Sequence, residues 1–104
     1  MGHSISPFTV RQTDEFGAWL RAIKDGPAQR RLLLRLRKAM QGNLGDVKPV
    51  GDGVYEMREF FGNGCRMYYV RRGRTLIVML GGGDKTTQDR DIVAAKRLAG
   101  TLED

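Results

Sequence analysis

Three extended segments joined by glycine-containing turns most constrain how this chain can fold. Val54–Phe61 and Cys65–Arg71 are rich in aromatic and other strand-forming residues, and the Gly-Asn-Gly sequence at 62–64 favours a hairpin turn between them. The Arg-Gly pair at 72–73 permits a second turn before Thr75–Leu80, which is almost wholly apolar. An apolar strand of this kind is typical of a sheet centre covered on both faces. The pattern predicts a three-stranded antiparallel meander.

Segments with helical periodicity lie on both sides of this meander. Apolar side chains recur at i, i+3, i+4 and i+7 in Asp14–Lys24, and leucines line one side of Pro27–Gln41. A third helix is expected over Thr87–Leu102, and Ile5–Val10 suits a short strand. The order predicts an α+β fold in which the N-terminal strand and an αα-hairpin pack on an antiparallel sheet, with a C-terminal helix.

The length of 104 residues indicates one domain spanning residues 1–104, with residues 1–4 expected to lie outside its folded part. The single cysteine, Cys65, excludes an internal disulfide and a multi-cysteine metal site. The only histidine, His3, lies in the terminal segment, which argues against Cys–His nucleophilic chemistry. We therefore expect neither a metal ion nor another cofactor.

The charge balance favours an anionic partner. Lys and Arg number 18 against 12 Asp and Glu, which gives a formal net charge of +6. This excess suits nucleic acid, an acidic protein or an anionic membrane, and a soluble domain with a basic surface is the alternative. No apolar run approaches the roughly 20 residues that cross a bilayer, and no secretory leader is evident. We expect a cytoplasmic protein that does not engage a membrane.

The glycine-rich stretch within Leu80–Ile92 ends like a phosphate-binding loop, in Lys-Thr. The phosphate-loop motif is G-x-x-x-x-G-K-[ST], but Asp84 stands where the second glycine belongs and the loop is too short. A carboxylate there repels phosphate, and an antiparallel meander is not the usual βαβ context. We expect instead that the glycines end the strand and let backbone approach neighbours closely, and that Thr86 or Thr87 caps the last helix.

Basic residues gather on one face of the predicted meander. Strand alternation places Arg58 on the face of Glu56, with Arg66 close by across the hairpin, and Lys85 emerges where the third strand ends. Converging cations imply an anion, which is either a carboxylate such as Glu56 or a bound phosphate. Such a site can cleave RNA without metal, because the cations stabilise phosphorane charge and the RNA 2′-hydroxyl is the nucleophile.

Two further groups are candidates for contact with RNA. The basic side of the second predicted helix, including Arg35 and Lys38, faces RNA or an acidic partner, or is simply a solvated helix face. Tyr68 and Tyr69 are candidates for stacking on a splayed base, and packing in or around the core is the alternative.

Four motifs carry a resemblance that spans nearly the whole chain. They are G-N-x-G-D-x-K-x-V-G, Y-E-M-R, G-x-G-C-R-M-Y-Y and G-G-G-D-K-x-x-Q-x-x-D-I. With them the chain resembles the RelE/ParE superfamily of toxins from bacterial type II toxin–antitoxin systems, and most of all the HigB-like addiction module killer subgroup. The resemblance implies a RelE-like α+β fold, ribosome-dependent mRNA cleavage, and neutralisation by a cognate antitoxin, often of the helix-turn-helix type. It also implies binding to operator DNA only through the antitoxin complex.

The same resemblance assigns roles to individual residues. The phosphate-contacting cations of the mRNA-cleaving members match Arg58, Arg66 and Lys85, and Lys48 with the basic second helix is expected to contact mRNA or ribosomal RNA. One of the family's sheet lysines is replaced here by Glu56, and the family's C-terminal tyrosine falls near Asp91. Glu56 or Asp91 is thus the candidate general base, with a helix N-terminal role as the alternative for Asp91.

Two rival functions share the implied fold, because fold alone does not decide function. A ParE-like toxin inhibits DNA gyrase by protein binding and needs no RNA-cleaving residues. An inactive toxin that works only within the antitoxin's DNA-binding complex is the other. The basic residues at 58, 66 and 85 favour RNA cleavage.

Overall fold

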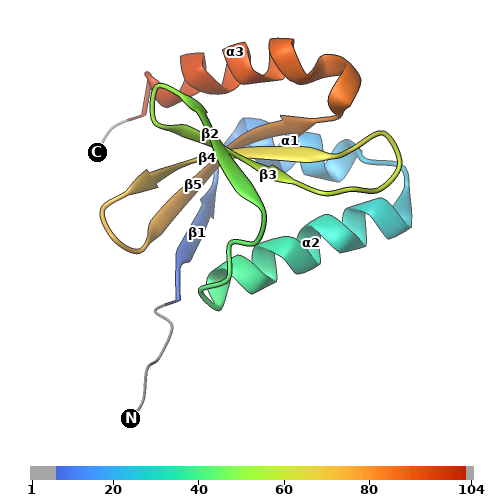
Figure 1. Cartoon of the computed structure of the whole chain (residues 1–104), viewed down its shortest axis with the longest axis horizontal. Helices are drawn as coiled ribbons and strands as arrows, with labels where there is room; N and C mark the ends of the chain where they lie inside the picture. Colours follow the sequence, from blue (N-terminus) through green and yellow to red (C-terminus); the bar gives the residue numbers. More distant parts are fainter. Residues whose placement is uncertain (1–6, 103–104) are drawn as a thin grey trace.

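The fold is built on one mixed β-sheet, which crosses the middle of the molecule in Figure 1. The computed structural model describes residues 7–102. Within that range the sheet has five strands in the order β1-β5-β4-β3-β2. The elements in chain order are β1 (Thr9–Gln12), α1 (Asp14–Ala22), α2 (Gly26–Met40), β2 (Val47–Gly51), β3 (Val54–Arg58), β4 (Arg66–Arg72), β5 (Leu76–Gly83), the 3-10 turn η1 (Lys85–Thr87) and α3 (Gln88–Ala99).

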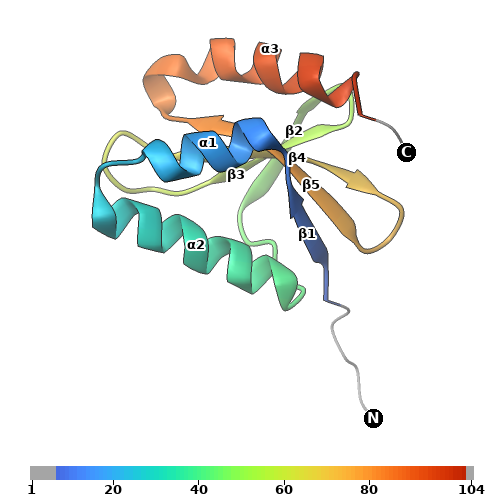
Figure 2. The same cartoon turned by 180° about the vertical axis from the view of Figure 1, so that it is seen from behind.

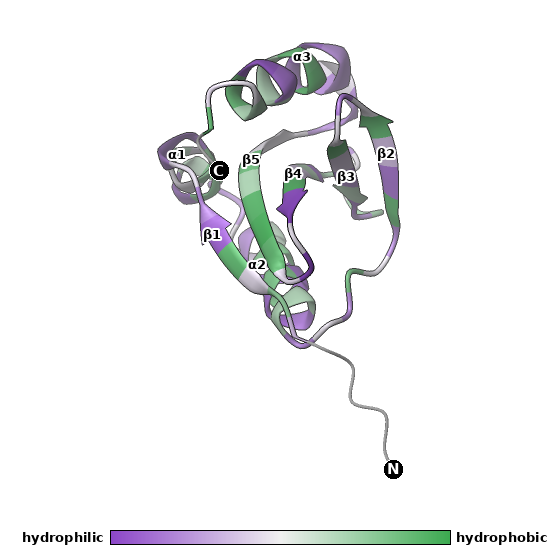
Figure 3. Cartoon of the chain, turned by 90° about the vertical axis from the view of Figure 1, so that its left-hand side faces the viewer, coloured by the Kyte–Doolittle hydropathy of each residue, from purple (hydrophilic) through white to green (hydrophobic). Residues whose placement is uncertain are grey.

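Helices cover both faces of the sheet, as Figures 1 and 2 show from opposite sides. α1 and α2 pack on one face, where Phe16 and Leu32 join Met57 in the larger apolar cluster. α3 packs on the other face, where Ala95 meets Val54 in a smaller cluster. Figure 3 shows the hydrophobic part of β5 enclosed between these helices. No helix in the described part of the chain is long and apolar enough to cross a membrane.

The predicted meander is confirmed, although two of its strands have different ends. β3 pairs antiparallel with β4, and β4 pairs antiparallel with β5. β3 stops at Arg58, three residues before the end that the sequence pattern predicts at Phe61. β5 does not stop at Leu80 but continues through the glycines to Gly83. The α+β class is therefore correct, and the glycines belong to the strand rather than ending it.

The remaining two strands differ from the expected antiparallel sheet. β1 pairs parallel with β5, with Thr9 opposite Leu76, so the sheet is mixed. The pattern predicts a start for this strand at Ile5, and residues 5 and 6 lie outside the described range. The pattern does not predict β2, because Pro49 and Gly51 are typical of turns. β2 tolerates its proline because it is an edge strand, paired with β3 alone.

Side-chain caps begin both helices of the αα-hairpin. The Thr13 hydroxyl accepts a hydrogen bond from the Phe16 amide at 3.1 Å and donates one to the Met79 carbonyl at 2.8 Å. This threonine therefore starts α1 and ties it to β5. Asp25 caps α2 in the same way, and α2 ends before Gly42, whose φ of 96° is a left-handed stop.

The end of β5 has no side chains because each helix layer lies too close to it. A Cβ on Gly82 would lie 2.4 Å from the ring of Trp19, on the side of α1. A Cβ on Gly83 would lie 1.8 Å from the carboxylate of Asp91, on the side of α3. The expected close approach of the backbone is thus confirmed at these two glycines.

Asp84, rather than Thr86 or Thr87, caps the turn that leads into α3. Its Oδ1 accepts hydrogen bonds from the Thr86 amide at 2.9 Å and from the Thr86 hydroxyl at 2.6 Å. These hydrogen bonds hold the pKa of the Asp84 carboxyl below its usual value. Thr87 occupies the N-cap position of α3, as predicted, but its side chain makes no capping hydrogen bond there. The side-chain cap comes instead from Asp84, whose extended backbone lets it reach the amides of η1.

Candidate functional site

Polar side chains replace apolar ones along the sheet face that carries α3, in the direction of the β3–β4 loop. Val54 lies in the apolar cluster beneath α3. The next two cross-strand pairs on this face are Glu56 opposite Tyr68 and Arg58 opposite Arg66. The two arginines are therefore direct neighbours across the hairpin, whereas the sequence left direct and diagonal pairing open.

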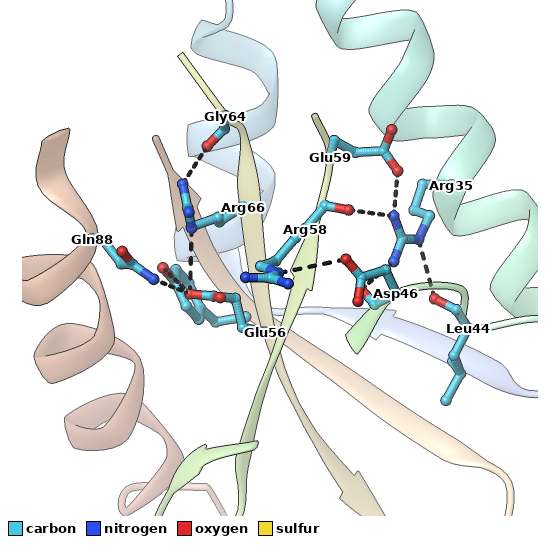
Figure 4. A network of polar contacts seen from close by, with 10 residues as sticks. Arg35, Leu44, Asp46, Glu56, Arg58, Glu59, Gly64, Arg66 and Gln88 are labelled. Atoms are coloured by element: carbon cyan, nitrogen blue, oxygen red, sulfur yellow. Dashed lines mark hydrogen bonds and ion pairs between the residues drawn. The ribbon is translucent and has the colours of Figure 1, made fainter. Parts of the chain in front are cut away.

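A buried carboxylate fixes one of these arginines, as Figure 4 shows. Glu56 has no exposed surface, and its Oε2 accepts hydrogen bonds from the Tyr68 hydroxyl at 3.1 Å and from Gln88 Nε2 at 2.8 Å. Arg66 Nε lies 3.6 Å from the same oxygen, and Arg66 Nη1 donates to the Gly64 carbonyl at 2.7 Å. The guanidinium neutralises the buried charge and is held in one orientation by it.

Arg58 is held more loosely than its neighbour. Its Nε lies 3.5 Å from Asp46 Oδ2, and the two side chains are 30% and 46% exposed. The Arg58 guanidinium also lies 5.4 Å from the centre of the Phe60 ring. An ion pair this exposed contributes little to stability, so Arg58 can exchange its carboxylate for an anionic ligand.

Lys85, which follows the end of β5, is the third member of the basic group formed with Arg58 and Arg66. It is exposed at the start of η1, and its amide donates to the Asn63 carbonyl at 3.1 Å, which ties η1 to the β3–β4 loop. Figure 1 shows this loop and the start of α3 at the same end of the molecule. A hollow of about 480 Å³ lies between them, lined by Phe60, Phe61, Gly62, Asn63, Gly64, Arg66, Lys85 and Thr86.

The sequence pattern misses Phe60 as a site residue. It places Phe60 in a strand beside Arg58, whereas the structure puts it in the loop after β3, where it is 74% exposed. The available signal is the Gly-Asn-Gly sequence at 62–64, because the pairing of a hairpin often ends before such a turn. Phe60 lines the same hollow as Arg66 and Lys85.

Arg35 is buried rather than exposed on the basic side of α2, contrary to the expectation. It is 7% exposed and donates to the carbonyls of Leu44 at 3.1 Å, Arg58 at 2.8 Å and Asp46 at 2.7 Å. Its Nη1 also pairs with Glu59. Arg35 therefore joins α2 to the ends of β2 and β3. Arg35 lies in the apolar stripe of α2, and that position indicates burial although the side chain is charged.

The two tyrosines are core residues. Of the two alternatives, packing in the core therefore holds, and stacking on an RNA base does not. Tyr68 is 0% exposed, and burial together with the Glu56 carboxylate raises the pKa of its hydroxyl. Tyr69 is 1% exposed, lies on the opposite face and stacks on Tyr55 at 5.5 Å. Burial raises the pKa of Tyr69 to about 12. Neither ring reaches a ligand without opening the core.

The remaining predicted residues divide between the two faces. Lys48 is exposed on β2 directly opposite Glu56, so it extends the basic group across the sheet. Lys38 is exposed on α2, which packs on the other face. Asp91 lies in the first turn of α3, 15% exposed, and accepts a hydrogen bond from the Thr87 hydroxyl. Of the two candidate bases, Asp91 retains a small exposed surface and Glu56 has none.

Comparison with known proteins gives one clear relative. No family model matches the chain, and no solved structure matches it. A protein of Haemophilus influenzae, described as an uncharacterized protein, is 40% identical to it over 93 residues, which is 89% of this chain and 94% of the relative. The match covers nearly all of both chains, so this protein belongs to the same family as the Haemophilus influenzae protein.

Proposed function

We propose that this protein is the toxin of a type II toxin–antitoxin system with a RelE-like fold, and that it cleaves ribosome-bound mRNA. The observation that carries the proposal is the direct pairing of Arg58 with Arg66 beside a hollow that Lys85 also lines. An exposed lysine beside two neighbouring arginines, one of them in an exposed ion pair, suits a phosphodiester ligand. The resemblance of the motifs to RelE/ParE-superfamily toxins, HigB-like members above all, adds to this support.

Charge stabilisation is the chemistry that these residues supply. The RNA 2′-hydroxyl loses its proton to water and attacks the adjacent phosphorus. The bond from phosphorus to the 5′-oxygen of the next nucleotide breaks, that oxygen takes up a proton from water, and a 2′,3′-cyclic phosphate remains. Arg66 and Arg58 stabilise the charge on the phosphorane oxygens, and Lys85 stabilises charge on the leaving oxygen. Arg66 is oriented before substrate arrives, because Glu56 and the Gly64 carbonyl already hold its guanidinium. An oriented donor needs no rearrangement in the transition state.

The proposal also includes partners. A cognate antitoxin, of the helix-turn-helix type in the subgroup that the chain resembles, neutralises the toxin, and operator DNA is bound only through that complex. The ribosome presents the mRNA, and Lys48, exposed beside Glu56, contacts the RNA backbone. The proposed setting is the cytoplasm.

The test is induced expression in bacteria, followed by mapping of mRNA 5′ ends. The expected result is growth arrest with discrete cuts inside codons of translated messages. Lys85→Ala should lower the cleavage rate about 10²- to 10³-fold, the range for loss of one charge-stabilising donor. Arg66→Lys should also lower it, while keeping a cation beside the buried Glu56.

Arg74→Ala is the matched control for charge. Arg74 is exposed in the turn between β4 and β5, at the opposite end of β5 from Lys85, so its removal should leave cleavage unchanged. Intact mRNA together with DNA damage would overturn the proposal and indicate a gyrase inhibitor. Growth without arrest, from a folded and expressed protein, would overturn it and indicate an inactive toxin. Equal effects of Lys85→Ala and Arg74→Ala would remove Lys85 from the mechanism.

A further inference from the structure

We propose that Phe60 is a stacking platform for one unpaired nucleobase of the RNA whose phosphate binds Arg58, Arg66 and Lys85. This inference rests on the proposed nuclease function and adds a base-binding position to it. Phe60 keeps 74% of its surface exposed, the most of any large hydrophobic side chain in residues 7–102. Single exposed apolar side chains are common on protein surfaces, so it is the position of this ring beside the cations that points to a ligand.

The loop that carries Phe60 is held in a fixed shape. The Glu59 amide donates to the Cys65 carbonyl at 2.9 Å, and the Gly64 amide donates to the Phe61 carbonyl at 2.9 Å. The loop is joined to η1 by the hydrogen bond from the Lys85 amide. Phe60 therefore projects from an anchored turn, which lowers the entropy lost when a base stacks on it.

The cations around the ring favour a nucleotide over an apolar protein partner. The Arg58 guanidinium lies 5.4 Å from the ring centre, and Arg66 and Lys85 line the same hollow. The other exposed large hydrophobic residues in the described chain, Leu33, Leu34, Met40 and Val93, lie on α2 and α3 and do not line this hollow. An aromatic ring among cations is the arrangement that binds single-stranded RNA, since the base stacks while its phosphate is paired.

The size of the hollow fits this assignment. Its volume of about 480 Å³ falls in the usual range of roughly 300–1,000 Å³ for small-ligand sites. Phe60, Arg66 and Lys85 all line it, so one nucleotide can present its base to the ring and its phosphate to the cations. Stacking of this kind tolerates every base, because each has a π-face.

The test measures binding of a fluorescein-labelled RNA hexanucleotide by anisotropy, with 2′-O-methyl sugars to prevent cleavage. A hexanucleotide of the same length without bases keeps the phosphates and removes the stacking. Phe60→Ala should weaken binding of the base-containing strand roughly 5- to 150-fold, the equivalent of about 1–3 kcal/mol per stacked base. Binding of the abasic strand should not change.

Two control variants separate stacking from loss of apolar surface. Phe60→Tyr keeps an aromatic ring and should bind within about twofold of the parent, a difference of about 0.4 kcal/mol. Val93→Ala removes another exposed apolar side chain, on α3, and should have no effect. Both positions are exposed, so each variant should fold, which circular dichroism checks.

Several results would overturn the inference. They are absence of binding to the base-containing strand, equal losses on both strands, and a Phe60→Ala variant that binds RNA like the parent but fails to capture a protein partner. The outcomes for Phe60 and for the nuclease are distinguishable. If cellular mRNA is cut and Phe60→Ala cuts it at the same rate and positions, the stacking role of Phe60 is refuted and the proposed nuclease function is supported. If no mRNA is cut, the nuclease falls and the oligonucleotide titration alone decides whether Phe60 stacks on bases.

Discussion

Replacing Arg35 by alanine should destabilise the fold far more than any other change of charge on α2. The side chain is 8% exposed and holds three backbone carbonyls and the Glu59 carboxylate. These partners come from the α2–β2 connection, the end of β3 and the residue after it. Alanine leaves all four acceptors without this donor, in a place that water reaches poorly.

The magnitude follows from the number and kind of these contacts. Each hydrogen bond to a charged group contributes about 1.5–3 kcal/mol, but local relaxation and entering water recover part of the loss. Removal of one partner from a buried ion pair costs about 3–5 kcal/mol, and we expect that range for Arg35→Ala. A domain of this kind has a total stability of roughly 5–15 kcal/mol, so the variant should lose about a fifth of it or more.

Urea denaturation followed by circular dichroism measures this loss. With an m-value of about 1–2 kcal/mol per molar, the midpoint should fall by roughly 1.5 M or more. Arg37→Ala is the matched control, because Arg37 is exposed on the same helix, and its effect should stay within about 0.5 kcal/mol. Arg35→Lys should be intermediate, since lysine keeps the charge but not the planar fork. A loss below about 1 kcal/mol, or one equal to that of Arg37→Ala, would refute the reasoning.

Three further predictions concern the glycines of β5, the buried phenol of Tyr69 and the exposed Lys48. Gly82→Ala should cost about 1–3 kcal/mol because its Cβ collides with Trp19, whereas Gly81→Ala, with open space beside it, should be nearly neutral in the same urea titration. Burial raises the pKa of Tyr69 from 10.0 to about 12 in the folded state, so the neutral phenol stabilises the fold fully at pH values below 10.0. That contribution should be lost as pH rises through the folded pKa. The difference in absorbance at 295 nm between the parent and Tyr69→Phe should show late ionisation of this phenol, and a difference that appears near pH 10 in the folded chain would contradict the prediction. Lys48→Ala should reduce the salt dependence of RNA affinity by about one unit of slope without altering stability, and an unchanged slope would exclude a phosphate contact.

The proximity of the two arginines could be predicted from the sequence because it depends on local geometry. Side chains alternate strictly along a strand, and a hairpin turn brings residues on either side of it together. Arg58 and Arg66 flank one such turn, so the sequence places them close together, as direct or diagonal neighbours, and the structure shows that they are directly opposite. The same local logic predicts the αα-hairpin, whose first helix begins at a side-chain cap next to the expected start.

Burial of polar residues could not be predicted in the same way, since it depends on partners distant in sequence. Arg35 follows Leu32 by three residues and precedes Leu36, which puts it in the apolar stripe of α2, but its acceptors appear only once β2 and β3 are in place. Tyr68 and Tyr69 are both buried because β4 is covered on both faces. The parallel pairing of β1 likewise requires the tertiary arrangement.

The glycines at the end of β5 have a practical consequence for spectroscopy. Trp19 is the chain's single tryptophan, and it rests on Gly82, one residue from the contact between Gly83 and Asp91. The indole and Asp91 also line one pocket together with Thr87. The protein therefore carries an intrinsic fluorophore across a bare strand from the start of α3. A shift in its emission maximum should report any movement of that helix end, without an attached dye.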